Sequence, residues 1–85
     1  MRRGWRLVLD EGAVEFLLAC RAKQRRQLIR FLDELRANPY LTGDFQEYDD
    51  TDRELQVKSH REFLITFWAD HATREIRIAH IETFQ

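Results

Sequence analysis

Four side chains in the second half of the sequence have the chemistry to bind a phosphate group or to transfer a proton. Lys58, His60 and Arg61 lie close together, and His80 follows in the last apolar segment, two positions before Glu82. Lysine and arginine bind phosphate oxygens, whereas histidine exchanges a proton near neutral pH. These four are therefore the candidate catalytic residues, with Glu82 as a possible general base.

Three of these residues also have a purely structural interpretation. His60 and Arg61 would occupy a solvated corner between two strands. A single lysine on a strand is commonly an edge or solvent residue. Because side chains alternate along a strand, Lys58 is expected on the same face of the sheet as Leu64 and Trp68.

The position of His80 is open to the same two interpretations. If His80 shares a face with Ile76 and Ile78, it stands where an apolar residue is due. A hydrogen-bonded, partly buried histidine is then favoured over a catalytic one. Glu82 is expected on the same face of the strand, and this pairing suits either interpretation.

The segment that positions these groups is RELQVKSHREFLITFWA, residues 53–69, which predicts two strands joined by a short polar corner. In the first strand, Leu55 and Val57 alternate with polar residues. The second strand is rich in β-branched and aromatic residues and is apolar on both faces. Its two faces carry Phe63, Ile65 and Phe67 on one side and Leu64, Thr66 and Trp68 on the other. A strand that is apolar on both faces belongs in the centre of a sheet.

The other predicted elements are a strand over residues 5–9, helices over 13–20 and 22–37, and strands over 45–48 and 75–84. Val14, Leu17 and Leu18 form the expected apolar stripe of the first helix. The expected buried stripe of the second helix is Leu28, Phe31, Leu32 and Leu35. Asn38 and Pro39 should end that helix, because the residue before proline leaves the helical region. The order β-α-α-β-β-β-β predicts a single α+β domain over residues 1–85, with an antiparallel helical hairpin on one face of a mostly antiparallel sheet of four or five strands.

This layout predicts an interaction surface. Two helices cover only one face of the sheet, so Leu64 and Trp68 would point out of the other. An apolar sheet face rimmed by charged residues is expected to bind a second copy or another chain. The alternative is that both side chains are buried against the chain itself.

Charge is unevenly distributed along the sequence. Residues 1–30 hold eight basic and three acidic residues, whereas residues 31–56 hold two basic and eight acidic ones, so the net charge of −1 is a poor guide to partners. The basic run includes Arg21, Lys23, Arg25 and Arg26 around the turn between the helices. Arg25 and Arg26 are candidates for contact with nucleic acid or with an acidic protein segment, and the alternative is a solvated helix face.

Several classes of site and location are disfavoured. The longest uninterrupted apolar run, Phe16 to Cys20, is too short to cross a bilayer. A single cysteine forms no internal disulfide, which favours a reducing cytoplasm. The spacing of His60, His71, His80 and Cys20 matches no metal-ligand pattern, and the acidic turn at residues 49–52 lacks the glycine and glutamate of a calcium loop. We expect neither a metal nor a cofactor.

The order and content of the elements resemble the RelE/ParE toxin superfamily, the toxin half of bacterial type II toxin–antitoxin modules. The resemblance spans nearly the whole chain. It rests on the opening strand WRLVL, the helix ending FLDELRANP, a loop with a glycine, the strand pair LQVKSHREFLITFW and the closing strand EIRIAHIE. It implies a microbial cytoplasmic protein that is neutralised by an antitoxin wrapped around its sheet and helices.

The resemblance implies one of two activities, because toxins of this superfamily either cut messenger RNA on the ribosome or poison DNA gyrase. Metal-independent RNA cleavage needs a base for the 2′-hydroxyl, cations for the phosphorane and an acid for the leaving oxygen. Lys58, His60, Arg61 and His80 are the residues available for these roles.

The sequence departs from the ribonuclease pattern at positions that carry its chemistry. Leu64 stands where those toxins typically have an arginine after the aromatic residue that opens the central strand. Those toxins carry basic residues on the preceding strand, where this chain keeps Lys58 but has Glu54 and Gln56 at neighbouring positions. Those toxins commonly end in a basic, tyrosine-containing tail past the last strand, whereas this chain stops at Thr83, Phe84 and Gln85. These departures favour a non-enzymatic binder, either a gyrase poison or a toxin-fold interaction module, and a homodimer is a third alternative.

Overall fold

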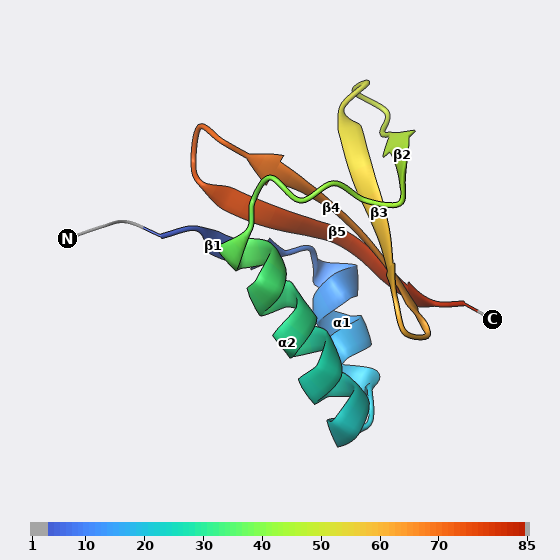
Figure 1. Cartoon of the computed structure of the whole chain (residues 1–85). Helices are drawn as coiled ribbons and strands as arrows, with labels where there is room; N and C mark the ends of the chain where they lie inside the picture. Colours follow the sequence, from blue (N-terminus) through green and yellow to red (C-terminus); the bar gives the residue numbers. More distant parts are fainter. Residues whose placement is uncertain (1–3, 85) are drawn as a thin grey trace.

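In the computed structural model, which describes residues 4–84, two helices pack on one side of a five-stranded sheet (Figure 1). The elements in chain order are β1 (Arg6–Leu9), α1 (Glu11–Ala19), α2 (Ala22–Ala37), β2 (Phe45–Tyr48), β3 (Glu54–His60), β4 (Phe63–Asp70) and β5 (Glu75–Thr83). This is the predicted α+β arrangement in the predicted order, and the bounds of α2 and β2 are those expected from the sequence.

The strands lie in the order β1-β5-β4-β3-β2, so β4 and β5 are both central. Consecutive strands from β2 to β5 pair antiparallel, and β1 joins the edge of β5 in parallel, with Leu7 opposite Ile76. A parallel neighbour needs a long crossover connection, and α1 and α2 supply part of the chain that separates β1 from β5. The sheet is therefore mixed but mostly antiparallel.

One irregularity interrupts the pairing of β4 with β5. Thr66 lies opposite His80, but the next residue, Phe67, lies opposite Ile78, so Ala79 is an extra residue in β5. An extra residue of this kind is a β-bulge, and it reverses the face on which later side chains project. Ile81 consequently returns to the face of Ile78 and is 3% exposed.

The core lies between the helices and one face of the sheet. Its fully or nearly fully buried members on the sheet are Phe63, Ile65, Phe67, Ile76, Ile78 and Ile81, and those on α2 are Leu28, Phe31, Leu32 and Leu35. The predicted stripe of α2 is thus confirmed. The helix ends at Ala37, and Asn38 caps it immediately before Pro39, as the sequence indicated.

The predicted stripe of α1 is correct for Leu17 and wrong for Val14 and Leu18. Val14 and Leu18 are 41% and 71% exposed, and the buried side of α1 is instead Ala13, with Phe16 and Leu17 partly buried against the core. Phe16 meets Phe63 edge-on, with 6.0 Å between ring centroids. This aromatic contact lies on the side of α1 that packs against the core. Asp10 stands at the N-cap position of α1, but its side chain makes no capping hydrogen bond.

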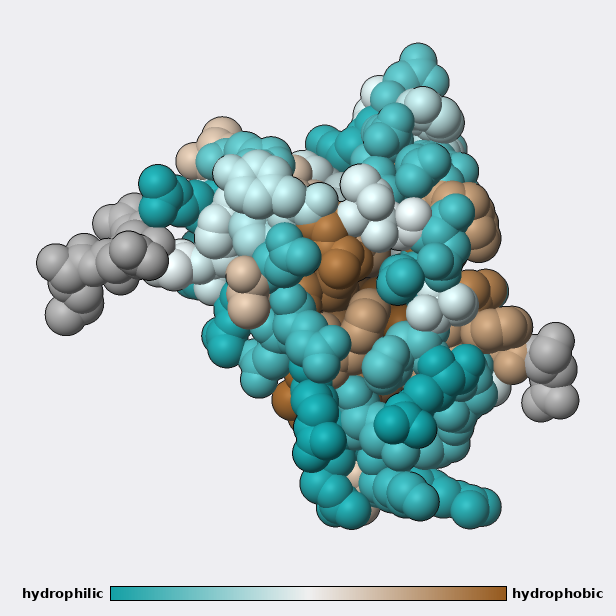
Figure 2. Space-filling view, viewed as in Figure 1, coloured by the Kyte–Doolittle hydropathy of each residue, from teal (hydrophilic) through white to brown (hydrophobic). Residues whose placement is uncertain are grey.

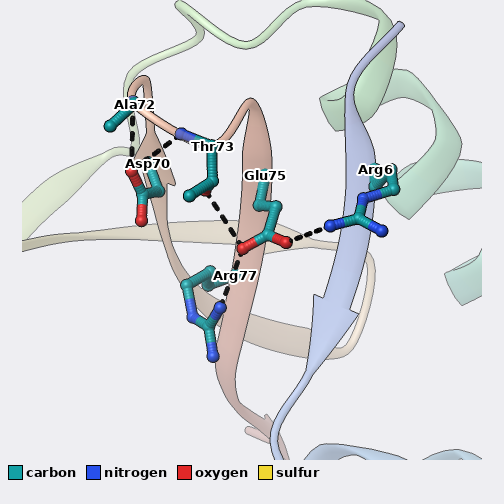
Figure 3. A network of polar contacts seen from close by, with 6 residues as sticks. All are labelled: Arg6, Asp70, Ala72, Thr73, Glu75 and Arg77. Carbon is teal, nitrogen blue, oxygen red and sulfur yellow. Dashed lines mark hydrogen bonds and ion pairs between the residues drawn. The ribbon is translucent and has the colours of Figure 1, made fainter.

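A buried carboxylate fastens the edge strand β1 to β5 (Figure 3). Glu75, opposite Arg6 in the register, accepts hydrogen bonds from Arg6 at 2.6 Å, from Arg77 at 2.9 Å and from the Thr73 hydroxyl at 3.1 Å. Burial raises the pKa of the Glu75 carboxyl, but these hydrogen bonds and the charge of Arg6 outweigh burial, so its pKa is lowered.

Candidate partner-binding face

The helices leave one face of the sheet open, and its composition follows from the register. In antiparallel pairs, residues directly opposite one another project to the same side. Val57 pairs with Thr66, and Leu64 pairs with Glu82 and Ser59, so all of these lie on the face opposite the helices. Val57 and Thr66 are buried there, Leu64 is half-buried, and Ser59 and Glu82 are exposed at the rim.

Trp68 lies on this open face, beneath two guanidinium groups. The Arg53 group stands 4.0 Å from the centre of the ring and the Arg77 group 5.9 Å. Both arginines also have acidic partners, since Arg53 contacts Asp49 at 3.4 Å and Arg77 contacts Glu75. The indole is half-buried beneath these charges, which makes Trp68 a rigid, partly covered anchor on the open face.

Of the four candidate catalytic residues, only His80 lies on the open face. Its Nε2 is 3.0 Å from an oxygen of Glu82, and the two side chains are 60% and 53% exposed. The predicted pairing of these residues on one face is correct. The prediction of a partly buried histidine is wrong, because the bulge at Ala79 places His80 opposite Thr66 instead of in the core.

Lys58 and His60 lie on the opposite side, toward the helices. Their register partners are Ile65 and Phe63, both core residues, so the predicted placement of Lys58 beside Leu64 and Trp68 is wrong. The Lys58 ammonium contacts Asp44 at 3.1 Å. Arg61 occupies the turn between β3 and β4 in a left-handed conformation with φ 56°. The sheet thus separates His80 from Lys58 and His60, and the four candidates do not form one site.

Asp44 is a partner of Lys58 that no pattern in the sequence singles out. Its carboxylate accepts hydrogen bonds from the backbone N–H and the hydroxyl of Ser59, both at 2.8 Å. These bonds, together with Lys58, lower the pKa of Asp44 to about 2. A lysine held by a carboxylate in this way is a weaker candidate for phosphate binding than its sequence position suggested.

The two arginines proposed to contact a partner differ in their surroundings. The guanidinium of Arg25 donates hydrogen bonds to the carbonyl oxygens of Leu17, Leu18 and Cys20, at 2.9, 3.3 and 2.7 Å. These carbonyls end α1, so Arg25 caps the C-terminus of that helix from α2. Arg26 is exposed and forms no ion pair or hydrogen bond within residues 4–84 that involves its side chain.

A hollow of about 380 Å³ lies beneath the loop that follows α2, between that loop and the ends of β3 and β4. Figure 2 shows hydrophobic residues gathered between this loop and the helices, and hydrophilic residues over α2. Tyr40 stacks on His71 at the rim, with 5.3 Å between centroids. Two polar groups of the hollow are already engaged, because Gln56 accepts a hydrogen bond from Gly43 and Glu54 accepts one from Tyr48.

Within the described residues, no three His, Cys, Asp or Glu side chains gather in a way that would hold a metal ion. No helix among residues 4–84 is long and apolar enough to span a membrane. Burial raises the pKa of the Cys20 thiol, which leaves it less nucleophilic than an exposed cysteine.

Comparison with known proteins identifies the fold. No protein-family model and no curated protein sequence matches the chain. Solved structures of RelE proteins do match this chain. A chain of the archaeal RelE–RelB complex from Pyrococcus horikoshii matches with a TM-score of 0.75 at 14% identity, over 95% of this chain and 96% of that one. The isolated Escherichia coli RelE toxin has a TM-score of 0.77 at 14% identity, over 95% of this chain and 85% of that one. The predicted fold is therefore confirmed: this chain has the fold of RelE toxins.

Proposed function

We propose that this chain is the toxin, or a toxin-like member, of a type II toxin–antitoxin module in the cytoplasm and that a cognate antitoxin binds and neutralises it. The proposal is supported by the likeness of nearly the whole chain to RelE, including chains solved in complexes with RelB. The open face carries the apolar and aromatic anchors that a protein partner needs, with the half-buried Leu64 between Ser59 and Glu82 and with Trp68 under two arginines.

Binding, without RNA cleavage, is the mode of action that the geometry supports best. His80 and Glu82 form an exposed acid–base pair, but RNA cleavage also needs cations close to the reacting phosphate. Lys58 is on the other side of the sheet, and Arg77 is held by Glu75. The proposed toxin therefore inhibits growth by occupying a target such as DNA gyrase.

Messenger RNA cleavage is the second candidate activity, and the exposed His80–Glu82 pair is the observation that favours it. In that case His80 would exchange the proton of the attacking or leaving oxygen, and Glu82 would hold the imidazole in place. His80→Ala would then abolish growth inhibition while leaving the fold intact. Retained inhibition by this variant would remove the enzymatic alternative.

The first test is tightly controlled expression of the chain alone in a bacterium, with growth and messenger RNA integrity followed together. We expect growth arrest with intact RNA, relieved by co-expression of the protein encoded next to this chain. Arrest with cut RNA would establish the second candidate. Growth without arrest, in the organism of origin as well, would contradict the proposed toxin function.

Leu64→Asp tests the open face separately, because it places a charge on the apolar part of that face and leaves the core untouched. We expect this variant to lose co-purification with the neighbouring protein while keeping its melting temperature within a few degrees. Leu18→Asp is the matched control, since Leu18 is a leucine on the outer side of α1 and is 71% exposed. Equal loss of binding in both variants would contradict a specific role for the open face.

A further inference from the structure

The two helices expose apolar side chains on the side of the hairpin that is turned away from the sheet. Val14 and Leu18 of α1 and Ile29 of α2 are between 41% and 71% exposed. Val14 and Leu18 are four residues apart, so they lie on the same side of α1. Ile29 stands in the same relation to Arg25, whose guanidinium donates hydrogen bonds to the carbonyl oxygens that end α1. Ile29 therefore lies on the side of α2 that is turned toward α1.

The geometry of the hairpin places Val14 and Leu18 beside Ile29. Each residue turns an α-helix by about 100°, so Val14 lies about 100° and Leu18 about 140° around α1 from the buried Ala13. Ile29 lies about 100° around α2 from the buried Leu28, in the same sense. The two helices run antiparallel over one face of the sheet (Figure 1), so the same rotation leads toward the neighbouring helix in both. The three exposed apolar side chains thus line one outer groove between α1 and α2.

The two helices repeat one five-residue pattern with the charges reversed. The sequences are EGAVE at residues 11–15 and RQLIR at residues 26–30, each with a buried residue at its centre, an exposed apolar residue next to it and a charge at each end. The four charged residues are exposed, and within residues 4–84 their side chains form no ion pair or hydrogen bond. The outer groove is therefore bordered by an acidic ridge, Glu11 and Glu15, and by a basic ridge, Arg26 and Arg30.

A second copy of the chain complements both ridges at once. A two-fold axis that runs along the outer groove places α1 of each copy on α2 of the other, in antiparallel orientation. Glu15 is four residues before the end of α1, and Arg26 is four residues after the start of α2. Rotation about this axis leaves the height along the helices unchanged, so Glu15 meets Arg26 of the second copy. Glu11 and Arg30 are each eight residues from the same ends and form a second pair.

Charge also excludes the other two-fold arrangement of the same surfaces. An axis that runs across the helices would place α1 on α1 and α2 on α2, so that each ridge would face a ridge of its own sign. Like charges set against each other in an interface oppose association. The outer face of the hairpin is thus complementary to itself in one orientation only.

We propose that the outer groove and its two ridges bind the same surface of a second copy of this chain. The surface spans nine residues of α1 and 16 of α2, and at about 1.5 Å for each residue and about 10 Å for the width of a helix it covers about 400 Å² on each copy. This is about half of a standard interface, so the dimer is weak and its population depends on protein concentration. The proposal does not depend on the function proposed above, because Leu64 and Trp68 lie on the opposite side of the sheet.

The test is sedimentation velocity of the full chain at low salt, from micromolar to millimolar concentration. The variants are Glu15→Arg and Arg26→Glu, because each of them sets like charges against each other twice in the proposed dimer. In an equimolar mixture of the two variants, every positive charge at these positions faces a negative one again. Glu34→Arg is the matched control, since Glu34 is exposed on the side of α2 that is turned toward the β3–β4 turn. Thermal unfolding checks that each variant is folded.

We expect the native chain to dimerise and each of the two variants to raise the dissociation constant about tenfold or more, because like charges oppose association. The mixture of both variants should form a heterodimer with a dissociation constant within about threefold of the native value. Glu34→Arg should stay within about twofold of the native chain, because an exposed charge away from a contact has a small effect. Added salt should weaken the native dimer, since its ion pairs are exposed and screened.

Leu18→Asp separates this contact from the open face. The substitution places an acid in the outer groove beside the acidic ridge, so it should abolish the dimer. The same variant should still bind the neighbouring protein, because Leu64 and the rest of the open face are unchanged. The proposed dimer and the proposed antitoxin contact can therefore fail independently.

Three results would overturn the proposal. The first is a native chain that stays monomeric up to millimolar concentration. The second is a mixture of Glu15→Arg and Arg26→Glu that associates no better than either variant alone, since the two-fold arrangement requires these residues to meet. The third is a Leu18→Asp variant that keeps the dimer and loses the neighbouring protein, which would assign the outer groove to that protein.

Discussion

The carboxylate of Asp44 accepts two hydrogen bonds from Ser59, one from its backbone N–H and one from its hydroxyl, each 2.8 Å long. Asp44 ends the loop that crosses from α2 to β2, and its own N–H donates to the Val57 carbonyl at 2.8 Å. The loop that follows the helices is thereby fastened to β3.

The Asp44 contacts predict a specific dependence of stability on pH. The folded chain holds the pKa of Asp44 at about 2, below the value near 3.9 of an unfolded aspartate. A lowered folded pKa contributes stability above pH 4, and this contribution is lost as the pH falls toward 2. Urea unfolding of the native chain and of Asp44→Asn should give a clear difference at pH 7 that shrinks between pH 4 and pH 2. A difference independent of pH would show that the charge of Asp44 plays no part.

Gly43 permits the same loop to lie against β3. A Cβ on this residue would stand 2.5 Å from the Val57 carbonyl oxygen and 2.6 Å from its nitrogen, closer than atoms can approach. We expect Gly43→Ala to lower the free energy of unfolding by about 1–3 kcal/mol, as overpacking does. The measurement is urea unfolding followed by tryptophan fluorescence.

Gly12→Ala is the control for this substitution. Gly12 lies in the first turn of α1 and a Cβ there would meet nothing within 4 Å. Alanine should therefore stabilise the chain by about 0.4–1 kcal/mol, because it restricts the unfolded state and favours the helix. If the two substitutions shifted stability in the same direction, the close approach of the loop to β3 would be wrong.

Glu75 predicts how the edge strand β1 is retained. Glu75→Gln removes the charge that holds Arg6 and Arg77, and it leaves a buried amide that cannot bond both guanidinium groups as well. We expect faster hydrogen exchange of the β1 amides, with β4 changed much less. Because the pKa of Glu75 is lowered in the folded chain, acid should loosen β1 of the native protein in the same way. Uniform acceleration across all strands would instead indicate a global loss of stability.

The fold was predictable because apolar spacing identifies the elements without knowledge of their contacts. The stripe of Leu28, Phe31, Leu32 and Leu35 required a helix, and the apolar run after Glu62 required a central strand. The short helix α1 gave a poorer result. Nearly every position around it is apolar or small, so the pattern did not identify the buried side that Phe16 selects by packing on Phe63.

The candidate site was less predictable, because it depends on the face that each strand presents. Lys58 and His60 of β3 face the helices, where His60 stacks on Phe31 and the loop after α2 brings Asp44 to Lys58. The alternation of side chains within β3 shows which residues share a face, but it does not show which of the two faces is turned toward the helices. The bulge at Ala79 is likewise a property of the pairing of two strands, with no glycine or proline to announce it in the sequence.

The bulge itself can be tested at two neighbouring residues. His80 is exposed on the open face, whereas Ile81 is 3% exposed in the core. His80→Ala should therefore change the free energy of unfolding by no more than about 0.5 kcal/mol, and Ile81→Ala should lower it by about 2–5 kcal/mol. Without the bulge, the two side chains would exchange faces, and the costs of the two substitutions would exchange as well. Guanidinium unfolding of both variants at neutral pH distinguishes these arrangements, because only the bulged strand places the sensitive residue at position 81.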